Sequence, residues 1–403
     1  MTTDKTNLSD SPKPVWLHRL SLLIVCMVWP LIWIGGLVTT YDAGMAVPDW
    51  PGTYGKNLFL YPVSTWLFGP FDLLIEHGHR QLAAVIGFIA IITAVVAWRT
   101  ETRRWVAWLA IALLAAVIGQ GVLGGIRVVL SDRTFAMIHG CVGPMFFGIC
   151  VALAVVTGRW WTDRAKTIGE VRISRSLVVL GVAVAVLAYG QLVLGAQLRH
   201  VQATASPIGF AHLVRTHIVG AFLLWAMTAV LAWRLSRLER GSFSRIADMG
   251  SRSLVSAEKN GRSNSEKNGC GDLTLSPPAS LLVGFVGLQI ALGGSTWVVN
   301  YGWPQFAQLG GWSASYLVKS KAFVESFITT AHVATGSLIL AMAVMLTIRL
   351  ARSRWMTLRG QTIFADTASS REKSSSPSPT KQVGKISEPV EAATERNRKL
   401  QVT

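Results

Sequence analysis

Eight long apolar runs decide what this chain can fold into. Their approximate ranges are 17–39, 80–98, 105–130, 136–157, 176–198, 213–235, 279–299 and 327–350. Each is long enough to cross the hydrocarbon core of a bilayer, which is about 30 Å thick. Inside that core the backbone finds no water to bind, so each run must form a helix. The hydrophobic content of 51% and the mean hydropathy of +0.42 agree with this. We expect an all-α integral membrane protein with eight transmembrane helices.

Positive charge gathers in alternate connections between these runs. The Lys- and Arg-rich segments are 13–19, 99–104, 159–175, 234–267 and 349–354. Cytoplasmic loops of membrane proteins are rich in Lys and Arg, so the pattern predicts a multi-pass protein of the plasma (inner) membrane with both termini cytoplasmic. The same segments account for the net charge of +17, and we expect the bilayer rather than nucleic acid as the partner of this charge.

Several segments between and beyond the runs differ in character. Residues 1–16 form a polar cytoplasmic tail, and residues 240–278 and 351–403 are rich in Ser and charge, which is typical of disorder. The connection 40–75 is instead rich in aromatic residues and proline. We expect it to pack as a lid over the outer ends of the helices.

A short motif recurs along the chain. It reads GQGVLGG at 119–125, GQLVLGA at 190–196 and LQIALGG at 288–294, and Gly35-Gly36 keeps only the glycines in the first run. The helix after each copy carries a histidine near its outer end, and these are His79, His139, His217 and His332. The repeat predicts two pseudo-repeated four-helix bundles, residues 17–160 and 161–350, with ligand sites in their interiors.

The four histidines indicate haem. Any one of them alone is more often a packed interior residue, but four at one depth favour iron ligands. Two neutral imidazoles from facing helices can occupy both axial positions of a haem iron, so four histidines would hold two haems. Three pairings are open. We favour His79 with His139 and His217 with His332, because each pair stays within one half.

The remaining histidines are weaker candidates. His77 is expected to point away from His79, and His212 lies well round the helix from His217. His18 and His200 lie at the membrane interfaces, where we expect them to be solvated.

Glu76 lies three residues before His79 and shares its helical face. An acid in the first turn of a helix commonly interacts with the helix dipole. The alternative is that its carboxylate reaches the haem held by His79 and takes part in proton transfer or stabilises developing positive charge. Arginines on the same side are candidates for binding haem propionates, with lipid headgroups as the plain alternative. They are Arg80, Arg127, Arg199 and Arg215.

These residues resemble the haem A synthase family. The resemblance rests on Glu76-x-x-His79-Arg80, on DAGMAVPDWP at 42–51 and on the four repeated histidines, and it covers about 17–350 except 240–278. It implies an enzyme that oxidises the C8 methyl group of haem O to a formyl group by successive hydroxylations, giving haem A for cytochrome c oxidase. It also implies that His79 and His139 bracket the substrate haem, that His217 and His332 hold an electron-relaying haem b, and that Glu76 is the required acid.

The resemblance implies partners as well: a haem O synthase (protohaem farnesyltransferase) and cytochrome c oxidase assembly components. The sequence names no electron donor and leaves a homo-oligomer possible. Two other classes stay open at this point. A two-haem b-type electron carrier, similar to quinol oxidoreductases, needs four ligands but no Glu76. A transporter with repeated halves binds no haem.

Overall fold

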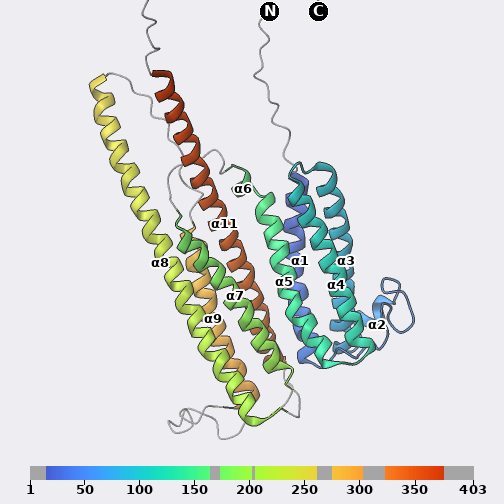
Figure 1. The fold of residues 1–403 in the computed structure, drawn as a ribbon. Coiled ribbons are helices and arrows are strands. Elements are labelled where there is room, and N and C mark those ends of the chain that lie inside the picture. The colour runs from blue at the N-terminus through green and yellow to red at the C-terminus, as the bar shows by residue number, and fades with distance from the viewer. Residues whose placement is uncertain (1–14, 164–172, 202–204, 261–274, 303–322, 376–403) are drawn as a thin grey trace, which may run out of the picture. The chain divides into compact units, whose positions relative to one another are not determined.

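The computed structural model describes residues 15–163, 173–201, 205–260, 275–302 and 323–375. Its long helices are α1 (Val15–Thr40), α3 (Phe71–Thr100), α4 (Arg104–Val129), α5 (Arg133–Thr157), α7 (Arg175–Arg199), α8 (Pro207–Asn260), α9 (Ser276–Tyr301) and α11 (Phe323–Ser375). Two short helices, α2 (Val63–Leu67) and α6 (Arg159–Asp163), lie in connections. Each of the eight long helices contains a stretch long and apolar enough to cross a membrane (Figure 1). The prediction of an all-α membrane protein with eight spans is confirmed.

The first bundle is a closed ring of four helices. Helix α1 packs on α3, α3 on α4, α4 on α5, and α5 returns to α1. Its interior is filled by fully buried apolar side chains such as Ile24, Ile86 and Leu113, which removes apolar surface from contact with lipid and fixes the ring. In a ring of this order, α3 and α5 lie diagonally across from one another. These are the helices of His79 and His139.

The second bundle repeats this arrangement. Helix α8 packs on both α7 and α9, and α11 closes the ring, because its Leu346 and Leu350 share one buried cluster with Leu177 of α7 and Leu282 of α9. Helices α8 and α11 are therefore the diagonal pair here. They carry His217 and His332. One compact unit, residues 1–358, contains both bundles, and residues 359–403 form a second unit.

The two bundles meet along α1, α5, α7 and α11. Helix α5 contacts α7, and the indole N–H of Trp29 donates to the carbonyl of Ala334 at 3.4 Å. Nearby, the rings of Trp33 and Phe327 lie 5.3 Å apart. Large aromatic side chains of α1 thus fill the seam against α11.

Three helix boundaries differ from the sequence expectations. Helix α3 begins at Phe71, nine residues before the apolar run, because Asp72 in its first turn suits the helix dipole although it lowers hydropathy. Residues 240–260 and 351–375 were expected to be disordered, yet they continue α8 and α11 as helix. Forming the first turn of a helix is costly, but a transmembrane span already supplies that turn. Each residue added to its end therefore gains a backbone hydrogen bond without a further nucleation cost. The rest of those segments, 261–274 and 376–403, lies outside the described residues.

The connection between α1 and α3 packs closely on the first bundle. Its Ala43 is buried in a small cluster with Val38 of α1 and Ile75 of α3. Val47 and Thr53 are fully buried as well. This segment, residues 41–62, is called the α1–α3 loop below.

Candidate functional site

Each of the four histidines occupies the same environment. Each side chain is half-buried, yet its Nδ1 atom is fully buried and has no hydrogen bond of standard geometry to any residue that the structure describes. The accessible part of each ring is therefore the edge away from Nδ1. A buried polar nitrogen without a partner is costly and calls for an explanation. For three of the four rings, a backbone carbonyl lies near and can accept from this nitrogen, which leaves the other ring nitrogen for a ligand.

Glycines of the preceding helix make room for the rings. A Cβ atom added at Gly35 would lie 2.8 Å from Cε1 of His79, and the corresponding distance from Gly293 to Cε1 of His332 is 3.1 Å. The contacts of Gly124 with His139 and of Gly195 with His217 are looser, at 3.4 and 3.5 Å. The recurring glycine therefore explains the sequence repeat: it lets the Cε1 edge of an imidazole approach the neighbouring helix closely.

A backbone carbonyl accompanies three of these glycines. The carbonyls of Leu31, Gln120 and Gln289 lie near the rings of His79, His139 and His332, respectively. Each carbonyl stands four residues before the glycine that packs on the same ring. Metal-binding histidines usually direct their second ring nitrogen to such a carbonyl, which fixes the ring orientation.

The structure brings the histidines together in the pairs that stay within one half. The rings of His217 and His332 have centroids 6.3 Å apart, with an angle of 78° between their planes. An imidazole nitrogen binds a first-row transition metal at about 2 Å, so two imidazoles on opposite sides of one iron have ring centres roughly 6 Å apart. In the first bundle, His139 is among the groups that act electrostatically on His79. The residues present therefore fit a haem with two axial histidines.

Glu76 lies beside the first pair and is almost completely buried, with 2% of its surface exposed. Its Oε2 accepts the backbone N–H of Val47 at 2.8 Å, and its Oε1 accepts from Arg80 at 2.7 Å. The carboxylate is thus held by the α1–α3 loop and by its own helix. Burial without loss of hydrogen bonds is the environment in which a carboxylate can serve as a proton carrier.

Arg80 and Arg127 differ in how far their guanidinium groups are occupied. Besides Glu76, Arg80 donates to the carbonyls of Val47, Asp49 and Gly52 at 2.6–3.0 Å, so it is engaged by the loop. Half-buried Arg127, in contrast, forms no hydrogen bond or ion pair with any residue that the structure describes. It is close enough to His79 and His139 to act on both electrostatically.

Sequence reasoning missed the surroundings of two other histidines. His200, expected to be solvated, is half-buried. Burial, and after it the charges of Arg199, Arg127 and Arg133, lowers its pKa to about 4. His77 does point away from His79, as predicted, but it is fully buried against the loop. No sequence signal marks either environment, because both depend on residues distant in the chain.

The first half of the chain matches known proteins. A family described as "Cytochrome oxidase assembly protein" matches residues 18–212. A heme A synthase of Alkalihalophilus pseudofirmus is 25% identical over 222 residues, which are 50% of this chain and 71% of the relative. One from Shouchella clausii is 27% identical over 232 residues, which are 53% and 72% of the two chains. A protoheme IX farnesyltransferase of Halobacterium salinarum is 30% identical over 142 residues, only 35% of this chain and 29% of that protein.

By these matches the chain is similar to heme A synthases and to the cytochrome oxidase assembly family. The matched residues 18–212 include the whole first bundle, with Glu76, His79 and His139. The second histidine pair, His217 and His332, lies beyond residue 212. The second half resembles the matched first half through the repeated glycine and histidine positions.

The two halves of the chain differ next to the histidines. The position equivalent to Glu76 is Val214 before His217 and Thr329 before His332. The Thr329 hydroxyl accepts from the Asn300 side chain at 3.4 Å. Neither residue carries a carboxylate, so among these three positions the acid accompanies only the first histidine pair.

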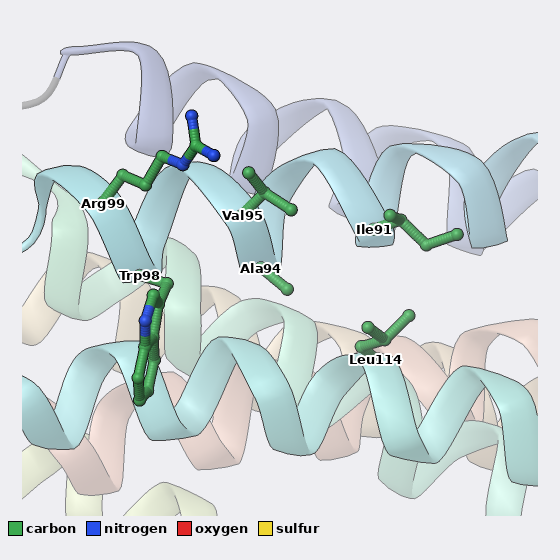
Figure 2. Close-up of a pocket in the computed structure, with 6 residues that line it drawn as sticks. All are labelled: Ile91, Ala94, Val95, Trp98, Arg99 and Leu114. Atoms are coloured by element: carbon green, nitrogen blue, oxygen red, sulfur yellow. The ribbon is translucent and has the colours of Figure 1, made fainter.

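A groove elsewhere on the first bundle is unrelated to this site. It has a volume of about 350 Å³, lies between α3 and α4 and is lined by Ile91, Ala94, Val95, Trp98, Arg99 and Leu114 (Figure 2). Ile91, Val95 and Trp98 are about half exposed on a membrane span, which is typical of a surface facing lipid. The Arg99 side chain turns away from Leu114 in Figure 2.

Proposed function

We propose that this protein is a haem A synthase, an oxidoreductase that converts the C8 methyl group of haem O to the formyl group of haem A for cytochrome c oxidase. The observation that carries the proposal is the pair of histidine sites, of which, among the described residues, only the first has a buried acid one helical turn from a histidine. Similarity to the cytochrome oxidase assembly family and the names of the relatives support it.

Each half holds one haem in this proposal. His79 and His139 bind the iron of the substrate haem, and His217 and His332 bind the iron of a haem b that relays electrons from a donor still to be identified. The bound irons supply the redox chemistry of the successive hydroxylations. The chain supplies fixed ligands: each imidazole lies against a glycine of the preceding helix, and three of the four also have a backbone carbonyl of that helix beside the ring, which limits the cost of ordering them on binding.

Glu76 is the acid of the first half. Because it is excluded from water, its interaction with positive charge developing nearby is stronger than it would be in solvent. Its buried position also allows it to hold or pass a proton at a defined atom, Oε1 or Oε2. Arg127 is the proposed partner of a propionate of the substrate haem, because a guanidinium that no described residue binds can bind a carboxylate bidentately. Arg80 is a second candidate through its remaining donors.

The cellular setting follows from the same proposal. The protein lies in the plasma membrane with both termini cytoplasmic, so the histidines are in the outer half of the bilayer. A haem O synthase supplies its substrate, and oxidase assembly components collect its product. The similarity to protoheme IX farnesyltransferases links the chain to that preceding step.

The test is extraction and chromatography of haems from cells that express the chain together with a haem O synthase. We expect haem A from the natural chain. From Glu76→Gln we expect accumulated haem O, with both haems still bound and reducible, because the amide keeps the shape but cannot carry the proton. Haem A production by Glu76→Gln at the natural rate would refute the role of Glu76. A haem-loaded natural chain that forms no haem A would favour a two-haem electron carrier, and a purified protein without a haem spectrum would favour a transporter.

A further inference from the structure

The α1–α3 loop is attached to α3 at two places, and the first is Val47. Both polar backbone groups of this fully buried residue are bound by α3: its N–H by Glu76 at 2.8 Å and its carbonyl by Arg80 at 2.7 Å. Arg80 also reaches the carbonyls of Asp49 and Gly52. The loop therefore covers the acid, and the acid is one of its fastenings.

The second attachment is His77, which projects from another side of the same helical turn. Its Nε2 lies 3.0 Å from the side-chain nitrogen of Gln81, and its Nδ1 lies 2.9 Å from Oγ1 of Thr53. An amide nitrogen only donates, so Nε2 accepts and the proton on Nδ1 is donated to Thr53. The rings of Tyr61 and Trp66 enclose the imidazole, at 5.4 and 5.0 Å between centroids.

The same loop also rests on α4. The Trp50 ring lies against Gly125, where an added Cβ would approach it to 2.5 Å, and the loop residue Gly44 lies against the guanidinium of Arg127. The loop is thus fitted to both helices around the first histidine pair. Close fits of this kind leave little freedom to shift without losing several contacts together.

From this geometry we infer that His77 is a positioning residue: through Thr53 it fastens the α1–α3 loop over Glu76, and so keeps the acid excluded from water and in the place that Val47 and Arg80 give it. Arg80 acts with it on the neighbouring loop residues. The role of the loop rests on the proposed function, whereas the fastening itself is a property of the fold. His77 touches neither histidine of the pair, so its effect on the reaction passes through the loop and Glu76.

A matched pair of variants at Thr53 tests the fastening without altering α3. Thr53→Val keeps the size of the side chain but leaves the Nδ1–H of His77 buried without an acceptor, and Thr53→Ser keeps the hydroxyl. Hydrogen exchange of the full chain in lipid nanodiscs, read by mass spectrometry on peptides covering 45–58, reports opening of the loop. We expect exchange at least about tenfold faster in Thr53→Val, because an unpaired buried donor weakens the closed state. Thr53→Ser should exchange at the natural rate, and peptides from α7 should not change in either variant.

Conversion of haem O in a single turnover, started with chemical reductant, tests the consequence for the acid. We expect slower conversion in Thr53→Val with unchanged haem content, and rescue in Thr53→Ser. Gly125→Ala, which displaces Trp50 from α4, is the second variant should Thr53→Val fail to fold, and it should show the same faster exchange. Unchanged exchange in a folded variant overturns the fastening. Faster exchange with natural conversion overturns the positioning role. Absence of haem A from the natural chain as well would refute the proposed function, while the exchange result still decides the fastening.

Discussion

Gly35→Ala is the change that most directly tests whether the glycines make room for iron ligands. The new methyl group would lie 2.8 Å from Cε1 of His79, closer than side chains approach one another without movement. Helix α1 is fixed at this point, because the next residue, Gly36, lies against Thr330 of α11. The imidazole must therefore move, and with it the first site.

The structure also sets the size of the effect. Inserting a methyl group into a well-packed interior costs about 1–3 kcal/mol, while replacing Gly by Ala within a helix recovers about 1 kcal/mol. The net cost is up to about 2 kcal/mol, which corresponds to haem binding in the first half up to about thirtyfold weaker. The equivalent change at Gly195 should have little effect, because its methyl group would lie at an ordinary contact distance of 3.5 Å from His217.

The assay is the haem content and the absorption spectrum of the purified protein, titrated with haem. Gly35→Ala should lose or shift the contribution of the first half and keep that of the second, whereas Gly195→Ala should keep both. Gly119→Ala on α4, where no atom lies within 4 Å of the new methyl group, is the control for a harmless glycine replacement. If Gly35→Ala binds haem in both halves as tightly as Gly119→Ala, the glycines do not serve the histidines and the argument is wrong.

Three further outcomes follow from the surroundings of the site. Arg127→Gln should weaken retention of the first haem by about tenfold or more, since a charge-assisted bond is lost, and equal loss from both halves in a haem-transfer assay would contradict this. Arg199→Met removes the donor that binds the Gly36 carbonyl and the Thr40 hydroxyl across the seam; unfolding should become about 1.5–3 kcal/mol easier, seen as a lower thermal midpoint. Burial and neighbouring arginines lower the pKa of His200 to about 4. As the pH falls, the unfolded chain therefore takes up a proton on His200 before the folded chain does. The contribution of His200 to the free energy of unfolding is lost as the pH falls from about 6.5 towards 4. In His200→Asn, the thermal midpoint of unfolding should fall less between pH 7.5 and pH 5 than in the natural chain. An unchanged pH dependence of the midpoint would refute the role given to His200.

The sequence predicts the spans and the histidines because both are periodic signals. Apolar runs of membrane length admit only helices, and a motif that recurs before each of four histidines marks equivalent positions. Even the preferred pairing follows from the repeat, since the two halves are the simplest closed rings. The ends of the helices are harder to predict, because hydropathy does not detect helical residues that lie outside the apolar runs. Examples are the start of α3 and the extension of α8 to Asn260.

The contacts of the acid were beyond sequence reasoning. Glu76 and Arg80 are four residues apart, so their ion pair is a plain helical expectation. Their shared hold on Val47 is not, because that residue is 29 positions from Glu76 and its backbone groups carry no sequence signature. The same is true of His77 and Thr53, whose contact depends on how the loop folds back over α3.

The two halves show how one scaffold can serve two purposes. Both present a diagonal pair of half-buried histidines, each lying against a glycine of the preceding helix, so iron binding needs nothing that one half has and the other lacks. Only the first pair has a carboxylate one turn from its leading histidine. Val214 and Thr329 at the equivalent places offer no group that ionises near neutral pH.

In the first half the acid is also bound into a loop that keeps water from it. A buried acid beside an iron ligand raises the chance of proton-coupled chemistry at that site, whereas its absence leaves the second site suited to passing electrons. In the proposed function, the surroundings of the histidines therefore set the role of each half. Exchanging Glu76 with Val214 is expected to abolish haem A formation without creating it in the second half. The second half would gain an acid but no counterpart of Arg80 to orient it, because the residue after His217 is Ile218.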